Sequence, residues 1–224
     1  VNTILIVLDK LKNMKFYSDF VSQIIIVDDN SLDGTTELLK KIEKDEKFKD
    51  DIFIFKSKNT GKGDSQRLAI PLCKGELTII QDADLEYNIE NINSLIELLI
   101  KNDYDAVLGF RKLKKTKLYS PYFLFHKVAV ITLTILTNLL YQSNFRDVCT
   151  CYRLIKTPIL KRLDIRGERF EFDFSMLNKL ALITKKIGNI QIDYTNRSFK
   201  DGKKNTWIVG FYAIKRILID RFNF

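Results

Sequence analysis

The feature that most constrains this fold is a run of β-branched residues, Ile24 to Val27, that stops abruptly at Asp28 and Asp29. A continuous apolar run of strand length, followed at once by polar residues, is typical of a strand covered on both faces. Such strands belong to parallel sheets, in which ligands bind beyond the carboxyl ends of the strands. We therefore expect Asp28 and Asp29 to lie at a ligand-binding edge, although acidic residues also follow strands simply to cap the next loop.

Strands and helices alternate along the chain, which predicts an α/β domain with a mostly parallel sheet. The opening residues Thr3 to Leu8 fit either a strand or a helical face, and we favour a helix. The apolar run Val128 to Tyr141 is shorter than the roughly 20 residues that span a bilayer, which leaves a buried or interfacial helix. The further predicted strands are 52–55, 77–80, 106–108 and 190–194, and the predicted helices are 35–42, 65–73, 91–101, 171–187 and 207–222.

The length and composition favour one globular domain. With 224 residues, of which 46% are apolar, the chain can bury one substantial core. Its net charge of +9 suits nucleic acid, an anionic membrane or a phosphorylated substrate, and does not choose among them. The three cysteines, Cys73, Cys149 and Cys151, fit neither a disulfide framework nor a CxxC metal pair, so a reducing cytosol is the simplest setting. No secretory signal opens the sequence.

An Asp-x-Asp motif, Asp82-Ala83-Asp84, comes directly after the strand predicted at 77–80. Side chains at i and i+2 of an extended segment point to the same side, so the two carboxylates can share a ligand. Mg²⁺ is usually held by one or two carboxylates together with substrate phosphates, and Mn²⁺ would serve as well. The motif therefore predicts a divalent cation and a diphosphate ligand, with Glu86 as a further ligand or support, although a solvated turn is the common alternative.

Two other features suggest contacts with phosphate. The turn Asn59 to Gly63 precedes a helix and offers backbone N–H groups and the Lys62 ammonium, but it lacks the spacing of a P-loop, so a plain turn stays open. The basic clusters at 111–117 and 197–204 are each followed by aromatic residues. Basic and aromatic residues beside an apolar helix suit a membrane headgroup interface, and single-stranded nucleic acid is the less favoured partner.

Taken together, these motifs resemble the family 2 glycosyltransferases, specifically the polyprenyl-phosphate (dolichol-phosphate) sugar transferase branch. The order and spacing of Val27–Thr35, Asn59–Gly63, Gln81–Tyr87 and Gly109–Arg111 carry the likeness. It continues almost to the end of the chain through Asn138–Tyr141, Asp147, Cys151-Tyr152, Arg169–Asp173, Asn196-Arg197, Gly202–Lys204 and Trp207.

The resemblance implies a GT-A type fold and inverting, metal-dependent transfer of a sugar from a nucleotide diphosphate to a polyprenyl phosphate or another membrane-associated acceptor, as in cell-envelope glycan synthesis. It assigns residues up to about 110 to the donor and metal and residues from about 111 to the acceptor and membrane. The implied donor contacts are Val27, Asp28, Asp29, Lys62, Asp82, Ala83, Asp84 and Arg111, and the implied metal ligands are Asp82, Asp84 and Glu86. The candidate acceptor and phosphate contacts are Arg197, Lys203, Lys204 and His126, and the candidate catalytic residues are Asp84, Arg111 and Asp173.

Two of these residues keep an alternative role. Asp173 is the candidate general base for a hydroxyl acceptor, and a helix-start cap is an equally open role for it. His126 is the only histidine, and without a second His or a Cys partner a structural role is favoured.

The chain also departs from the family pattern. Family members open with a strand that ends in a Pro-x-Tyr-Asn-Glu-like segment, whereas Val1 to Ile4 resembles the residues that come after that segment. We therefore expect the first strand to be missing and the donor pocket to be reduced. Many relatives continue into membrane-spanning helices, so attachment here is expected to be peripheral, on the cytoplasmic side, or through an anchoring partner or a homo-oligomer.

Two rival functions stay open at this point. A nucleotidyltransferase would use the same carboxylates but release pyrophosphate. A non-enzymatic basic module would bind membrane or nucleic acid without needing a metal.

Overall fold

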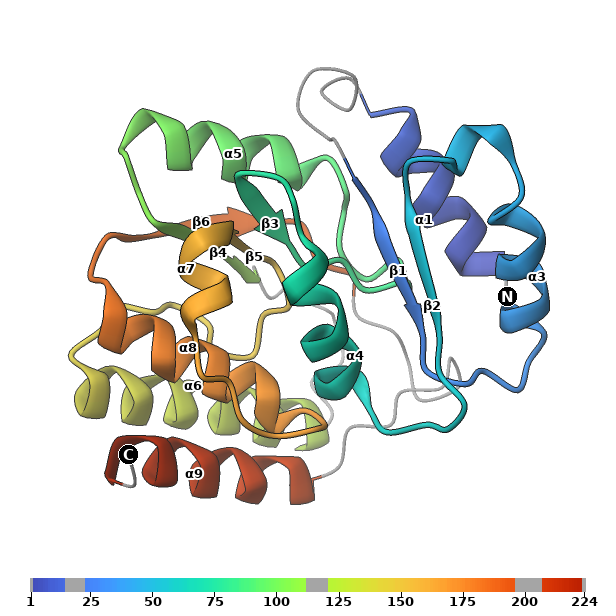
Figure 1. The fold of residues 1–224 in the computed structure, drawn as a ribbon. Helices are drawn as coiled ribbons and strands as arrows, with labels where there is room; N and C mark the ends of the chain where they lie inside the picture. Colours follow the sequence, from blue (N-terminus) through green and yellow to red (C-terminus); the bar gives the residue numbers. More distant parts are fainter. Residues whose placement is uncertain (1, 15–22, 112–120, 196–206, 223–224) are drawn as a thin grey trace.

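The structure is a computed structural model that describes residues 2–14, 23–111, 121–195 and 207–222 (Figure 1). Within these ranges, strands and helices alternate as predicted, and the opening segment forms a helix. In chain order the elements are α1 (Asn2–Lys12), β1 (Ile25–Asp28), α3 (Thr35–Ile42), η1 (Glu46–Phe48), β2 (Ile52–Phe55), α4 (Lys62–Ala69), η2 (Ile70–Leu72), β3 (Leu77–Ile79), α5 (Asn91–Lys101), β4 (Ala106–Arg111), α6 (Pro121–Tyr141), β5 (Arg153–Lys156), α7 (Thr157–Arg162), α8 (Glu171–Ile183), β6 (Ile187–Ile192) and α9 (Trp207–Phe222).

The strands in the described ranges form two sheets, and the larger one is mixed. A parallel pair, β1 with β2, stands beside a four-stranded sheet of order β3-β5-β4-β6. In that sheet β5 runs antiparallel to both β3 and β4, while β4 and β6 are parallel. The α/β class is confirmed, whereas the mostly parallel sheet is confirmed only in part, because two of the four described strand pairings are parallel and two are antiparallel. The hydrophobic pattern did not reveal β5, since only Leu154 and Ile155 separate its two charged ends.

The two faces of the four-stranded sheet are both covered, as an α/β fold requires. Ala106, Leu108 and Ile155 belong to the core that contains residues of α6 and α8, whereas Val107 and Leu154 belong to the core under α5. Successive strand residues alternate between these two cores because side chains along a strand point to opposite faces.

Helix α1 links the two sheets. Leu8 packs with Ile26 of β1 and Leu39 of α3, whereas Val7 and Met14 belong to the core under α5. The opening segment is therefore helical because its apolar residues face two cores at helical spacing, which a strand would not allow.

Helices α6, α8 and α9 pack against one another below the four-stranded sheet (Figure 1). The Tyr141 hydroxyl donates to the carbonyl of Ile217 at 2.7 Å, and the Asn178 amide donates to Asp220 at 3.1 Å, which ties α9 to both of its neighbours. Helix α8 ends at Ile183, four residues before the predicted end. The reason is that Ile187 already pairs with Ala106 in the sheet.

Candidate active site

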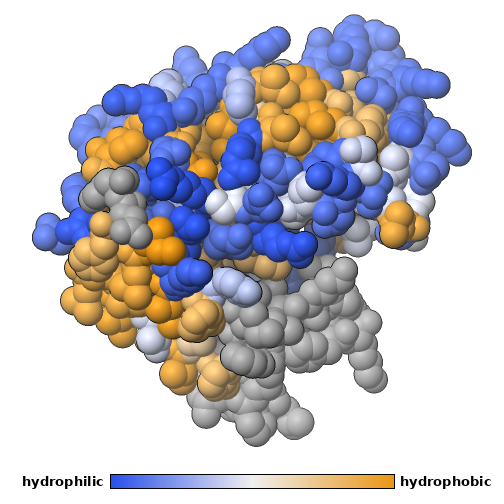
Figure 2. All heavy atoms as spheres, turned by 60° about the horizontal axis from the view of Figure 1, so that its bottom comes forward, coloured by the Kyte–Doolittle hydropathy of each residue, from blue (hydrophilic) through white to orange (hydrophobic). Residues whose placement is uncertain are grey.

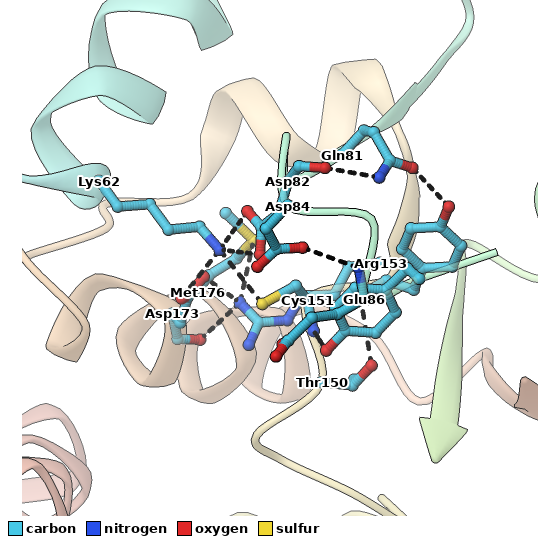
Figure 3. Close-up of polar contacts among 12 residues, drawn as sticks. Lys62, Gln81, Asp82, Asp84, Glu86, Thr150, Cys151, Arg153, Asp173 and Met176 are labelled. Atoms are coloured by element: carbon cyan, nitrogen blue, oxygen red, sulfur yellow. Dashed lines mark hydrogen bonds and ion pairs between the residues drawn. The ribbon is translucent and has the colours of Figure 1, made fainter. Parts of the chain in front are cut away.

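The site lies where the end of β3, the start of α4, the start of α8 and the loop before β5 meet (Figure 3). Lys62, the first residue of α4, donates to both carboxylate oxygens of Asp82, at 2.7 and 3.0 Å. The same ammonium lies 3.2 Å from the Cys151 sulfur and 3.8 Å from Asp173. Residues predicted separately from the Asn59–Gly63 turn, the Asp-x-Asp motif and the start of α8 therefore form one cluster.

Two glycines hold the turn that carries Lys62. Gly61 has a φ of +103°, a left-handed conformation that favours glycine. A Cβ on Gly63 would lie 2.4 Å from the Cβ of Phe172, so the backbone of α4 approaches the start of α8 more closely than any side chain would permit. The Asp64 amide then donates to the carbonyl of Glu168 at 2.9 Å. This close approach sets Lys62 beside Asp173.

Asp29, at the end of β1, holds the other side of the same turn. Its carboxylate accepts from the amides of Thr60 and Gly61 at 3.0 and 2.8 Å, and from the Lys56 ammonium at 2.6 Å. Partial burial raises the pKa of Asp29, but the Lys56 ammonium and the two amides outweigh it, so the pKa lies below its ordinary value. The carboxyl ends of β1 and β3 are thus connected through this turn, while a contact between Asp29 and a nucleotide base stays a prediction.

Asp28 has a different set of partners, although it is adjacent in sequence. It is buried, and its oxygens accept from Ser31 at 2.6 Å and from the hydroxyl of Thr36. These contacts hold the loop that leads into α3, which is the capping role considered for acidic residues at strand ends. Val27 precedes it as a partly buried residue of β1, and donor contacts by either residue stay predictions.

The Asp-x-Asp segment presents its two carboxylates together. Figure 3 shows the side chains of Asp82 and Asp84, on either side of Ala83, on the side of the segment that faces Lys62 and Cys151. Asp84 also accepts from the Glu86 amide at 3.1 Å. Residues 83 and 84 form a turn and not the extended segment that the i, i+2 argument assumes, so the shared direction of the two carboxylates comes from the turn.

The carboxylates of Asp82 and Asp84 suit a divalent cation that takes its other ligands from water and substrate oxygens. In the described ranges, no group of three or more His, Cys, Asp and Glu side chains is placed to hold a metal by itself. Mg²⁺ needs only one or two carboxylates when water and phosphate oxygens supply the rest, and Asp82 and Asp84 meet that requirement. Glu86 accepts from the Tyr194 hydroxyl at 2.8 Å, which favours support of the segment over direct ligation.

The electrostatics of the cluster keep Lys62 and Asp82 charged. Burial raises the pKa of Asp82, but Lys62 and the hydrogen bond with Cys151 lower it below its ordinary value. Burial lowers the pKa of Lys62, but Asp173, Cys151 and Asp82 raise it well above its ordinary value. Burial raises the pKa of the Cys151 thiol to about 12, so this sulfur stays protonated at neutral pH.

Asp173 forms a buried ion pair that the sequence did not predict. Arg153 in β5 donates to its carboxylate at 2.8 Å and to its backbone carbonyl at 3.0 Å, and the Arg153 side chain is only 1% exposed. Helix α8 has no side-chain cap at its start, so the helix-cap role of Asp173 is not observed. Arg153 was missed because it lies in the unpredicted strand β5. Its only sequence signal is an arginine among apolar residues.

Arg111, at the end of β4, is held away from the Lys62 cluster. Its guanidinium donates to both oxygens of Asp147, at 2.7 and 3.0 Å, and lies 5.1 Å from the Tyr194 ring. Burial lowers the pKa of Arg111, but Asp147 raises it well above its ordinary value. The Tyr194 ring in turn lies 5.1 Å from that of Tyr87, whose hydroxyl accepts from the Cys151 amide at 3.0 Å. Arg111 is thus linked to the cluster through these two aromatic rings.

Most of the predicted acceptor residues lie outside the part of the chain that the structure describes. These are Arg197, Lys203 and Lys204, together with the basic segment 112–117. His126 belongs to α6, but its side chain is not among those described. Their roles stay predictions.

Comparisons with known proteins agree with this geometry. A family model described as "Glycosyl transferase family 2" matches residues 1–164. An uncharacterised protein of Methanocaldococcus jannaschii is 27% identical over 213 residues, which cover 93% of this chain and 88% of the relative. A dolichyl-phosphate β-glucosyltransferase of Dictyostelium discoideum is 26% identical over 196 residues, which cover 83% of this chain and 59% of the relative.

Among solved structures, the glucosyl-3-phosphoglycerate synthase of Mycobacterium tuberculosis, in complex with Mn²⁺, uridine diphosphate and glucosyl-3-phosphoglycerate, aligns with a TM-score of 0.68 at 14% identity. The alignment covers 98% of this chain and 75% of that one, and it confirms the predicted GT-A type fold. Because the family model covers most of the sequence, the chain belongs to glycosyl transferase family 2 and is a glycosyltransferase.

Proposed function

We propose that this glycosyltransferase moves a sugar from a nucleotide diphosphate to a polyprenyl phosphate at a membrane surface, with inversion and with Mg²⁺ or Mn²⁺ as cofactor. The observation that carries the proposal is the pairing of Lys62 with Asp82, two residues from Asp84, just beyond the end of β3. Two carboxylates for a cation and an ammonium for phosphate, on one sheet edge, form a site for a diphosphate. We treat residues 1–224 as one domain, with the donor bound by residues up to about 110 and the acceptor by the remainder.

Each donor-site residue then has a distinct task. Asp82 and Asp84 would hold the divalent cation, which neutralises charge on the departing diphosphate. Lys62 would bind the diphosphate from the turn that Gly61 and Asp29 fix in place. Arg111, which lies over the Tyr194 ring, would contribute positive charge to the donor site from beyond the rings of Tyr87 and Tyr194. The mycobacterial synthase, which has a similar fold, is in complex with Mn²⁺ and uridine diphosphate, and this supports a metal and a nucleotide as ligands of the proposed site.

A phosphate acceptor agrees with the surroundings of Asp173. A phosphate monoester with a second pKa near 6 is largely ionised at neutral pH and needs no strong general base. Asp173 is held by Arg153 at 2.8 Å and lies 3.8 Å from Lys62, so its carboxylate is already engaged with two cationic side chains of the protein. The Dictyostelium relative, named for dolichyl phosphate, points to the same acceptor class.

An apolar face on α6 and α9 supports a membrane-bound acceptor. The exposed side chains recur at helical spacing, and Figure 2 shows hydrophobic surface gathered over this end of the molecule. Apolar patches of this extent on a soluble protein mark interaction sites, and the net charge of +9 suits an anionic lipid surface. The residues are Phe125, Val128, Ile131, Ile135 and Leu139 on α6, and Phe211, Tyr212, Ile214, Leu218 and Phe222 on α9.

Membrane contact is proposed to be peripheral and on the cytoplasmic side. None of the helices in the described ranges combines the length and hydropathy needed to cross a bilayer. An amphipathic helix can instead lie in the headgroup region with its apolar face buried. An anchoring partner or a second copy of the chain covering the same face is the alternative outcome, and no role in nucleic-acid binding is proposed.

The decisive experiment incubates the protein with a panel of nucleotide sugars, Mg²⁺, and either polyprenyl phosphate or 3-phosphoglycerate. The proposal predicts a lipid-linked sugar together with a nucleoside diphosphate, and loss of both products when the metal is chelated. If sugar is transferred to 3-phosphoglycerate but not to polyprenyl phosphate, the acceptor is a small phosphorylated molecule and not a lipid. Release of pyrophosphate would indicate a nucleotidyltransferase instead.

One variant tests the acceptor class, and one result favours a non-enzymatic role. If Asp173→Asn retains turnover with polyprenyl phosphate, the phosphate acceptor is supported over a hydroxyl acceptor. If no product forms, and if membrane binding survives both chelation and Asp84→Asn, the chain acts as a basic binding module.

A further inference from the structure

Lys62 occupies the position that a cation bound to Asp82 would need. Its ammonium donates to both carboxylate oxygens of Asp82, at 2.7 and 3.0 Å, and its side chain is 25% exposed. Its other neighbours at the site, Cys151 at 3.2 Å and Asp173 at 3.8 Å, also present electron-rich atoms to it. The first carboxylate of the Asp-x-Asp motif is therefore already neutralised by a side chain of the same protein.

A divalent cation at Asp82 would compete directly with this ammonium. Mg²⁺ binds carboxylate oxygens at about 2.0–2.1 Å, and Lys62 already contacts both oxygens of Asp82. A doubly charged ion and an ammonium within a few ångströms of each other also repel strongly in a partly buried site. The ammonium and the metal would therefore each bind this carboxylate less tightly when both are present.

We infer that Lys62 holds Asp82 and exchanges with the divalent metal when the donor diphosphate binds. The inference rests on the proposed function and deepens it. Displaced from Asp82, the ammonium needs another anionic partner, and a diphosphate supplies one. Metal and nucleoside diphosphate therefore bind cooperatively, while metal alone binds weakly.

The exchange requires only a side-chain movement. Gly63 lies against Phe172 too closely for the backbone to shift inward, and Gly61 is held by Asp29 through its amide at 2.8 Å. The Lys62 Cα therefore stays fixed while its four-carbon side chain moves between partners. Asp173, 3.8 Å from the ammonium, is a second carboxylate close to the Lys62 side chain.

The test measures Mn²⁺ binding calorimetrically, with Mn²⁺ alone and with saturating uridine or guanosine diphosphate. Lys62→Gln is expected to bind Mn²⁺ alone about tenfold more tightly than the wild type and to show weaker coupling between the metal and the nucleotide. Lys62→Arg retains the positive charge and is expected to bind Mn²⁺ alone as weakly as the wild type. Lys58→Gln makes the same change of charge at an exposed residue four positions earlier and should leave Mn²⁺ binding unaltered.

Different results would overturn the inference and the proposed function. If Lys62→Gln binds Mn²⁺ alone no more tightly than the wild type, while both bind it with nucleotide, Lys62 is not a competing cation and the inference fails alone. If neither protein binds Mn²⁺ even with nucleotide, the metal-dependent function itself is wrong. Lys62→Met provides the same comparison if the glutamine variant does not fold, as judged by its circular dichroism.

Discussion

The cluster at the end of β3 and the apolar face of α6 and α9 differ in whether their side chains have partners within the protein. In the cluster, Lys62 and Asp82 are paired, as are Arg153 and Asp173, so these charges are balanced within the protein. On the face, apolar side chains such as Leu139, which is 74% exposed, remain in contact with solvent. The cluster therefore forms its ion pairs within the protein, whereas the face would become buried only on contact with another surface. Substitutions in the cluster should change the free energy of unfolding or the rate of sugar transfer. Substitutions on the face should change binding to lipid vesicles.

The largest effect is expected from breaking the buried pair of the cluster. Arg153→Leu leaves the Asp173 carboxylate buried without its main partner, and loss of one member of a buried pair costs about 3–5 kcal/mol. Denaturant unfolding followed by circular dichroism measures the free energy of unfolding of the variant and of the wild type. The double variant Arg153→Leu/Asp173→Leu should recover part of the loss, because it removes the unpaired charge.

A matched control uses an ion pair on the surface. Lys186→Leu breaks a pair with Asp103 in which both side chains are mostly exposed, so it should change stability little. Equal losses for Arg153→Leu and Lys186→Leu would mean that the cluster is no more organised than the surface.

The second largest effect is expected on catalysis. Asp84→Asn removes one carboxylate of the Asp-x-Asp motif but retains an acceptor for the Glu86 amide, so the fold should persist. Loss of one preorganised electrostatic group typically costs about 10²–10³ in turnover. Initial rates of sugar transfer at saturating donor and metal measure it. Unchanged turnover would separate the motif from catalysis and leave the cluster with a structural role only.

Sequence reasoning succeeded where the chemistry depends on neighbouring residues. Figure 3 shows Asp82 and Asp84 on one side of the segment, as expected, although residues 83 and 84 form a turn and the shared ligand stays a prediction. The α/β class and the opening helix α1 were also predicted from local periodicity. The apolar run from Val128 was assigned to a buried or interfacial helix, and it lies within α6.

Sequence reasoning failed where the partner is distant along the chain. Strand β5 contains only two apolar residues, and it becomes a strand because β3 and β4 pair with it on both sides. Arg153 within it could not be matched to Asp173, which lies 20 residues further along the chain. The contact of Asp29 with the turn at Thr60 and Gly61 likewise depends on the arrangement of β1 and α4 in space. Local patterns thus located the carboxylates, and only tertiary structure supplied their partners.

The apolar face offers a smaller effect that contrasts with the cluster. Leu139→Ser removes one exposed apolar side chain and is expected to weaken binding to vesicles of mixed neutral and anionic lipid about fivefold to tenfold, with stability unchanged. Ile100→Ser is the matched control, because Ile100 is 60% exposed on α5, away from α6 and α9. Sedimentation with vesicles measures both variants. Equal losses for the two would show that lipid does not select the α6 and α9 face, and a change in oligomeric state with Leu139→Ser would point to a second copy of the chain.

The smallest effect is expected from the acid titration of Asp29, which connects the strand end to the Lys62 turn. The pKa of this carboxyl is lowered in the folded protein, so its stabilising contribution is fully present above the ordinary value of 3.8 and is lost as the pH falls from there through the folded pKa. The free energy of unfolding of the wild type should therefore fall more steeply below about pH 4 than that of Asp29→Asn, which has no carboxyl to titrate. Between about pH 5 and pH 7 the free energies of unfolding of the two proteins should change in parallel with pH. The variant should be less stable by a constant amount, because its side-chain amide binds Lys56 less well than the carboxylate does. Parallel curves through the acid range as well would mean that the charge of Asp29 contributes nothing to holding the turn, and that Gly61 and Gly63 position Lys62 by backbone packing alone.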